Sequence, residues 1–364
     1  INESPATTTI KVSKIRFIYF IVFNFSKLHL ANGRPKAIIG DYCFSYMDCH
    51  VYFLFLCQNK TLIDMKRSLF AFLAAVAMTA CVSRPSAPEA TQSRIVEEGG
   101  TGPYKALMFE APSLEAHTVF SPEDLSKFGK KNLLPVLVWG NGACTNSPWE
   151  HYKFLNEIAS HGFLVIATGY IPMEDGPYHG PRSTSEQQIE AIDWAIAQNS
   201  DKNSPFYGRV DVDAIAAAGM SCGGLQTLDN SADPRLKTLM ILNSGLFINP
   251  MGAVPGMPMP EKEKLQNITV PVIYILGGEE DIAYANGMDD YHRLTKVPAF
   301  AANYPVGHGG TYGQPHGGEF TIPALAWLQW QLQGNEEAAK MFTGSPCGLE
   351  LRDGWTIEKN ELID

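Results

Sequence analysis

The sequence lacks features that several classes of protein require. No Lys/Arg-rich run occurs in the body of the chain and the formal net charge is −10, so a basic face for a nucleic-acid partner is not expected. None of the seven cysteines belongs to a C-x-x-C pair, which argues against a zinc site and against a thioredoxin-like motif. No internal repeat is visible.

The composition that remains is typical of a globular protein. Hydrophobic residues make up 45% of the chain and charged residues 18%, which is too apolar for a disordered protein. Residues 101–364 are predicted to form one domain. About 260 residues are many for a single core but normal for an α/β enzyme.

Residues 65–81 have the pattern of a bacterial secretory signal. Met-Lys-Arg is followed by an apolar run too short to span a bilayer and by a small-residue exit. The ending Met-Thr-Ala-Cys81 resembles a lipobox and predicts a lipid-modified Cys81. This implies a secreted bacterial lipoprotein at the outer membrane, in the periplasm or on the cell surface, with no other contact with a membrane. An ordinary signal with an incidental cysteine is the alternative.

The segments on either side of this signal are not expected to belong to the fold. Residues 1–64 are interpreted as an upstream extension foreign to the natural protein, because a complete signal begins only at Met65; a membrane-anchoring segment is the alternative. Residues 82–100 are rich in Ser, Pro, Ala, Thr, Gln and Glu, which predicts a flexible tether.

Short apolar runs alternate with amphipathic stretches from about residue 101 onward. This alternation predicts right-handed crossovers and an α/β fold with a mostly parallel central sheet flanked by helices. An antiparallel hairpin is expected at the sheet edge over 104–110 and 115–120. The predicted strands are 133–139, 163–168, 214–219, 237–242, 270–276 and 299–305, and the predicted helices are 149–160, 185–199, a helix from about 223, and 322–333.

The segment Gly-Met-Ser-Cys-Gly at 219–223 indicates a nucleophile. It follows an apolar strand and opens a helix, which is the context that the G-x-S-x-G motif needs. The tight turn holds the serine in a strained backbone conformation, and small glycines on both sides let the chain pass. Ser221 is therefore the predicted catalytic nucleophile.

The partners of such a serine follow it in the order acid, then histidine. Asp281 comes just after a predicted strand and is the predicted acid, with Glu279 and Glu280 as rivals. His308 stands in a Gly-His-Gly-Gly turn after the next strand and is the predicted general base, with His316 as the competitor.

Two backbone N–H groups are needed to stabilise the negative oxygen that develops during acyl transfer. One is expected from Cys222, directly after the nucleophile, and the other from Asn141, with Gly142 as the alternative donor. Because the two loops that carry these groups meet in such a fold, Cys144 and Cys222 are hypothesised to form a disulfide bond.

With these motifs in place, residues 103–335 resemble the cutinase, poly(ethylene terephthalate) hydrolase and platelet-activating-factor acetylhydrolase branch of the α/β-hydrolases. Polyester hydrolases usually carry Gly-Tyr or Gly-Phe where this chain has Gly140-Asn141, and Met where it has Cys222, so the resemblance supports ester hydrolysis more than polyester cleavage. The matching features are Trp139-Gly140-Asn141, the helix 185–199, Gly-Met-Ser-Cys-Gly-Gly, Glu-Glu-Asp281-Ile-Ala and Gly-His308-Gly.

The expected function is therefore a serine carboxylic ester hydrolase that works through an acyl-enzyme, without a metal or organic cofactor. Its substrates are expected to be short-chain or aromatic esters, with polyesters as a further class, and the protein is treated as a monomer. Two alternatives are a serine peptidase of the prolyl-oligopeptidase type and a non-catalytic binding protein with a hydrolase fold.

Overall fold

A computed structural model describes residues 93–171, 180–249 and 256–363. The predicted extension 1–64, the signal 65–81 and the lipidation site Cys81 lie outside the described residues. Within the described ranges, no helix is long and apolar enough to cross a membrane.

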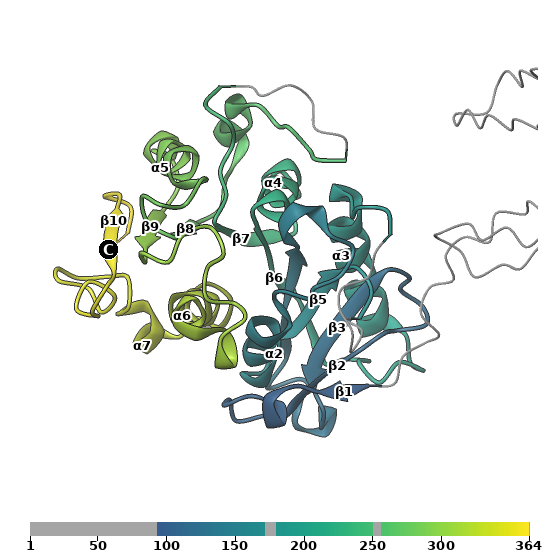
Figure 1. The fold of residues 1–364 in the computed structure, drawn as a ribbon. Helices are drawn as coiled ribbons and strands as arrows, with labels where there is room; N and C mark the ends of the chain where they lie inside the picture. The colour runs from purple at the N-terminus through teal and green to yellow at the C-terminus, as the bar shows by residue number, and fades with distance from the viewer. Residues whose placement is uncertain (1–92, 172–179, 250–255, 364) are drawn as a thin grey trace, which may run out of the picture. The chain divides into compact units, whose positions relative to one another are not determined.

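A ten-stranded sheet runs through the described domain, with the strand order β1-β2-β3-β5-β4-β6-β7-β8-β9-β10 (Figure 1). The strands β5, β4, β6, β7, β8 and β9 pair in parallel with their neighbours, whereas β1, β2 and β3 at one edge and β10 at the other pair antiparallel. The predicted α/β-hydrolase fold with a mostly parallel sheet is confirmed. The strands are β1 (Arg94–Ile95), β2 (Ala106–Phe109), β3 (His117–Pro122), β4 (Leu134–Gly140), β5 (Leu164–Thr168), β6 (Val210–Met220), β7 (Leu236–Leu242), β8 (Val272–Leu276), β9 (Ala299–Asn303) and β10 (Thr356–Lys359).

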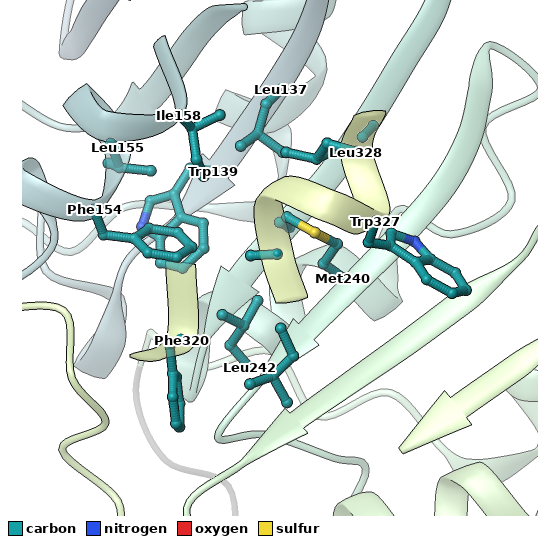
Figure 2. Close-up of a cluster of buried hydrophobic side chains, with 14 of the residues drawn as sticks. Leu137, Trp139, Phe154, Leu155, Ile158, Met240, Leu242, Phe320, Trp327 and Leu328 are labelled. Carbon is teal, nitrogen blue, oxygen red and sulfur yellow. The ribbon is translucent and has the colours of Figure 1, made fainter. Parts of the chain in front are cut away.

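Helices cover both faces of the sheet because successive strand residues point to opposite sides. Buried side chains of α2 and α6 form one core with one face, and buried side chains of α3, α4 and α5 form a second core with the other. Figure 2 shows the first core, in which Trp139 of β4 lies against Phe154 of α2 and Trp327 of α6 lies near Met240 of β7. The helices are α2 (Tyr152–Ser160), α3 (Ser185–Ser200), α4 (Cys222–Asp229), α5 (Tyr284–Arg293), α6 (Thr321–Gln333) and α7 (Glu336–Ala339).

The predicted tether 82–100 does not extend to residue 100. Arg94–Ile95 pairs with β2, Val96 is 5% exposed, and the Asn156 side chain donates a hydrogen bond to the Val96 carbonyl at 3.1 Å. These contacts cover a backbone that a tether would leave in water, so the folded domain begins by Arg94. The edge strand β10 was not predicted either, and it lengthens the sheet beside β9.

Candidate active site

Ser221 lies in a sharp turn between β6 and α4. Its backbone has φ 52° and ψ −116°, a conformation that costs on the order of 1–3 kcal/mol for a non-glycine residue and persists only where neighbouring contacts enforce it. Here the Ser221 N–H donates to the Leu242 carbonyl at 3.0 Å, and the Ser244 hydroxyl donates to the Ser221 carbonyl at 2.7 Å. The end of β7 therefore fixes the serine at the carboxyl edge of the sheet.

The first turn of α4 lies directly against the end of β4. A Cβ atom on Gly223 would be 2.0 Å from the Gly140 carbonyl oxygen and 2.7 Å from the Asn141 nitrogen. Only glycine permits this approach, because any side chain would collide with backbone atoms. The glycine after Cys222 thus brings the start of α4 next to the loop that follows β4.

The structure brings together the three side chains that the sequence singled out. His308 Nε2 is 3.0 Å from Ser221 Oγ, and His308 Nδ1 is 2.6 Å from Asp281 Oδ1. Both distances are within hydrogen-bonding range. Ser221 follows β6, Asp281 lies in the turn after β8, and His308 lies in the loop after β9, so the carboxyl ends of three parallel strands supply them.

Asp281 is 3% exposed and accepts hydrogen bonds on both carboxylate oxygens. Oδ1 accepts from the Ala283 N–H at 2.9 Å, and Oδ2 accepts from the Gly277 N–H at 3.0 Å and from Asn243 Nδ2 at 2.7 Å. Burial by itself raises the pKa of Asp281, but the hydrogen bonds from His308 and these donors outweigh burial and lower the pKa below its usual value. The group therefore remains a carboxylate at neutral pH.

The rival residues lie elsewhere. Glu279 and Glu280 are exposed on the turn before Asp281. The ring of His316 faces Glu157 at 3.2 Å and Glu97 at 3.5 Å, so it pairs with carboxylates of another part of the domain. Neither set takes part in the hydrogen bonds that join Ser221, His308 and Asp281.

Sequence reasoning missed two residues of the site, Asn243 and Tyr312. The Asn243 amide lies between Asp281 and the Tyr312 hydroxyl, from which its carbonyl oxygen accepts a hydrogen bond. One signal was present for Asn243, a polar residue placed directly after the strand β7 at the same sheet edge. No local signal marks Tyr312, whose contact depends on the path of the loop that carries His308.

The loop after β4 is tied covalently to the start of α4. The structure contains the hypothesised disulfide between Cys144 and Cys222, with a Cα–Cα distance of 5.1 Å. Ala143 and Cys144 have positive φ values of 51° and 50°. The Asn141 side chain donates to the carbonyls of Thr145 and Thr168 at 3.0 and 2.6 Å, so it holds the loop rather than facing the nucleophile.

Several buried polar atoms of this loop and of the end of β4 have no hydrogen-bond partner among the described residues. They include Trp139 Nε1, Asn141 Oδ1, Ser147 Oγ and both ring nitrogens of His151. Burial lowers the pKa of His151 to about 3, so its imidazole is neutral at physiological pH. The loop thus combines satisfied groups, such as the Asn141 amide nitrogen, with buried side-chain atoms that lack partners.

A cavity of about 430 Å³ lies beside the loop. It borders Met220 and Gly309, the chain neighbours of Ser221 and His308, and so lies next to the segments that carry these two residues. Its volume is within the range of small-molecule sites. The remaining lining residues are Trp149, Glu150, His151, Tyr152, Lys153, Tyr312 and Gly313.

A parallel sheet with a strained serine between strand and helix, followed in the chain by a hydrogen-bonded aspartate and histidine, defines an α/β-hydrolase. Residues 147–295 match the model of the PET hydrolase-like family, which confirms the resemblance to the cutinase-related branch of this class. The match supports a serine ester hydrolase in general. It includes Ser221 and Asp281, begins after Cys144 and ends before His308. No curated protein matches the chain.

Proposed function

We propose that the protein is a serine carboxylic ester hydrolase in which Ser221, His308 and Asp281 act as a catalytic triad. The observation that carries this proposal is the unbroken hydrogen-bond chain from Ser221 Oγ through both nitrogens of His308 to Asp281. The strained turn at Ser221 supports it further, since such strain is maintained where a nucleophile must project from the sheet.

The geometry is suited to an acyl-enzyme mechanism. Ser221 Oγ attacks the ester carbonyl carbon while its proton moves to His308 Nε2, and His308 returns that proton to the departing alcohol oxygen. Water then attacks the acyl-enzyme with His308 again as the base, which releases the carboxylic acid and regenerates Ser221. Asp281 accepts from the Nδ1–H of His308 and stabilises the imidazolium that forms in each step.

The backbone N–H groups of Cys222 and Asn141 are the proposed donors to the developing oxyanion. Cys222 is the first residue of α4, and the first N–H groups of a helix have no partner within the helix. The close approach of Gly223 to Asn141 N brings the second donor beside the first. Loss of one such donor typically lowers kcat by about 10²–10³-fold.

Short-chain or aromatic esters are the proposed substrates, and polyesters remain a further class to test. The cavity of about 430 Å³ carries the aromatic side chains of Trp149, Tyr152 and Tyr312, which favour a small or flat apolar group. The exposed carboxylate of Glu150 at the same cavity and the net charge of −10 disfavour anionic substrates.

The proposal is tested by hydrolysis of p-nitrophenyl esters with C2 to C16 acyl chains by the full chain, with Ser221→Ala in parallel. Ser231→Ala, a buried serine whose hydroxyl has no partner among the described residues, is the matched control. We expect the wild type and the control to cleave short chains and Ser221→Ala to be inert. If the wild type cleaves no ester, the esterase proposal fails, and peptide amides then test the alternative of a serine peptidase.

We also propose that the mature protein is a secreted lipoprotein attached to the membrane through Cys81. Labelling of the expressed protein with a radioactive fatty acid is expected to be lost in Cys81→Ala. Label that persists in this variant, or its absence from the wild type, would refute lipidation at this position.

A further inference from the structure

We propose that Asn243 and Tyr312 form a positioning unit that fixes the Asp281 carboxylate for the reaction. The inference rests on the proposed function, since it assigns these residues a role in a triad. Among the described residues, neither side chain is hydrogen-bonded to Ser221 or His308. Both would therefore act through Asp281.

Asn243 occupies a position where three loops meet. It follows β7, its Nδ2 donates to Asp281 Oδ2 at 2.7 Å in the turn after β8, and the same Nδ2 lies 3.4 Å from the Gly307 carbonyl, next to His308. Its backbone N–H donates to the Ile275 carbonyl of β8 at 2.8 Å. The side chain thus links the ends of β7, β8 and β9 at the sheet edge where the triad lies.

The backbone of Asn243 is suited to asparagine in particular. Its φ is 42°, in the left-handed region that Asn tolerates better than other non-glycine residues. The residue is fully buried, so an amide left without partners would carry a large desolvation cost. Both ends of this amide are instead hydrogen-bonded, one to the acid and one to Tyr312.

The Asn243 amide faces in one direction because Asp281 accepts from one end of it and Tyr312 donates to the other. The Tyr312 hydroxyl donates to Asn243 Oδ1, and an ionised Asp281 only accepts, so Nδ2 must point to the acid and Oδ1 to the tyrosine. Burial, together with the nearby negative charge of Asp281, raises the pKa of Tyr312 well above its usual value, so the hydroxyl keeps the proton that it donates. Exchange of the two amide atoms would place Oδ1 against the ionised Asp281 carboxylate, acceptor against acceptor.

The ring of Tyr312 is itself immobilised by aromatic neighbours. Its centroid is 5.4 Å from the ring centroids of both Phe154 and Phe320 and 6.1 Å from that of Trp139, all in edge-to-face arrangements. These three side chains belong to the core shown in Figure 2. Asn243 and Tyr312 therefore connect the acid to the packed aromatic core of the domain.

The first test compares Asn243→Ala and Tyr312→Phe with the wild type on the p-nitrophenyl ester that it cleaves best. We expect kcat to fall on the order of 10- to 100-fold in Asn243→Ala, because misplacement of a catalytic group is costly. In Tyr312→Phe we expect a fall of about 2- to 10-fold, the equivalent of one hydrogen bond. KM should change little in either variant, since Asn243 does not line the cavity and Tyr312→Phe keeps the aromatic ring that does.

Two buried residues of the same types serve as controls. Asn156 donates to the Val96 carbonyl and Tyr274 to Asp290 Oδ2 at 3.3 Å, so Asn156→Ala and Tyr274→Phe each remove a buried hydrogen bond that does not reach the triad. Both should keep the wild-type kcat. Thermal unfolding of every variant separates loss of activity from loss of fold, and Tyr312→Phe preserves the ring packing if Asn243→Ala proves unstable.

The second test repeats both substitutions in an Asp281→Ala background. If Asn243 and Tyr312 act through the acid, neither should lower kcat further once the carboxylate is absent. Equal losses in both backgrounds, or full activity of Asn243→Ala and Tyr312→Phe in the wild-type background, would overturn the inference while the esterase proposal stands. A wild type that cleaves no ester, or a Ser221→Ala variant as active as the wild type, would instead overturn the proposed function and this inference with it.

Discussion

The two sides of Ser221 are held in place by different means. On the proposed acid–base side, Asp281 is fixed by donors from Asn243, Gly277 and Ala283, so that both of its carboxylate oxygens have partners. On the proposed oxyanion side, one covalent bond between Cys144 and Cys222 ties the loop after β4 to the start of α4, and the Asn141 side chain donates a hydrogen bond from this loop to Thr168 of β5. Several buried polar atoms of the loop have no hydrogen-bond partner among the described residues.

This difference predicts how each side should respond to substitutions. In a hydrogen-bond network several contacts position each group, so the loss of one peripheral hydrogen bond should lower activity only in part. When a single disulfide bond is removed, the whole constraint that it placed on the loop is lost. The positive φ values of Ala143 and Cys144 are on the same side, so that loop can relax to less strained backbone conformations once the bond is gone.

The largest effect on kcat is expected from substitution of Asp281, which lies at the centre of the hydrogen-bond network. Asp281→Asn should lower kcat on the order of 10³–10⁴-fold, because an amide at this position no longer holds the histidine in the required tautomer. Glu279→Gln changes an exposed acid of the same turn and should leave kcat unaltered. Ester hydrolysis under saturating substrate measures both, and comparable losses in the two variants would contradict the assignment of the acid.

The second-largest effect on kcat is expected from removal of the disulfide bond. Joint replacement of Cys144 and Cys222 by Ala is expected to lower kcat on the order of 10- to 100-fold with a smaller change in KM, because the two oxyanion donors lose their fixed separation. The bond closes a loop with a sequence separation of 78 residues, so the free energy of unfolding should fall by about 4 kcal/mol.

Cys347→Ala is the control for this experiment, since Cys347 is a buried free cysteine. Urea unfolding and steady-state kinetics are measured on both proteins. Wild-type kcat in the double variant would show that the loop keeps its shape without the bond, and the contrast between the two sides of the site would then be wrong.

The smallest effect concerns the unsatisfied polar groups of the oxyanion side. His151→Phe should leave stability at pH 7 unchanged or raise it by about 1 kcal/mol, because it removes two buried nitrogens that lack partners. Between pH 6.5, the ordinary pKa, and the folded pKa of about 3, the unfolded chain binds a proton that the folded protein does not.

The free energy of unfolding of the wild type should therefore decrease as the pH falls through this window. The His151→Phe variant lacks the imidazole and should not show this decrease. At pH 4.5 the gap in favour of the variant should have grown by about 2 kcal/mol. Urea denaturation at pH 7 and pH 4.5 measures the gap. A gap that stays constant would mean that His151 has a partner in solution which stabilises its protonated form.

Local patterns explain why much of the fold could be predicted. The apolar strand before Ser221 and the glycines around it lie within a few residues of each other, and strand ends in a parallel sheet meet at one edge, which placed Asp281 and His308 near Ser221. The same reasoning applied to the two loops suggested the bond between Cys144 and Cys222.

Features that depend on contacts between distant segments could not be predicted. Arg94–Ile95 is too short to show a strand period, and only its pairing with β2 separates it from a tether. The strand β10 likewise exists through its pairing with β9. Tyr312 is hydrogen-bonded to Asn243 across 69 positions of sequence, and the residues around either one do not predict that contact.

The disulfide has a topological consequence for the chain. Because it joins Cys144 to Cys222, it converts the intervening stretch into a closed covalent ring that contains α2, β5, α3 and β6. A single cut by a protease inside this ring leaves both products attached to each other, with the nucleophile still tethered to the loop after β4. Cleavage of the backbone and loss of the site are therefore separate events, and the protein would remain one molecule after a first cleavage inside the ring.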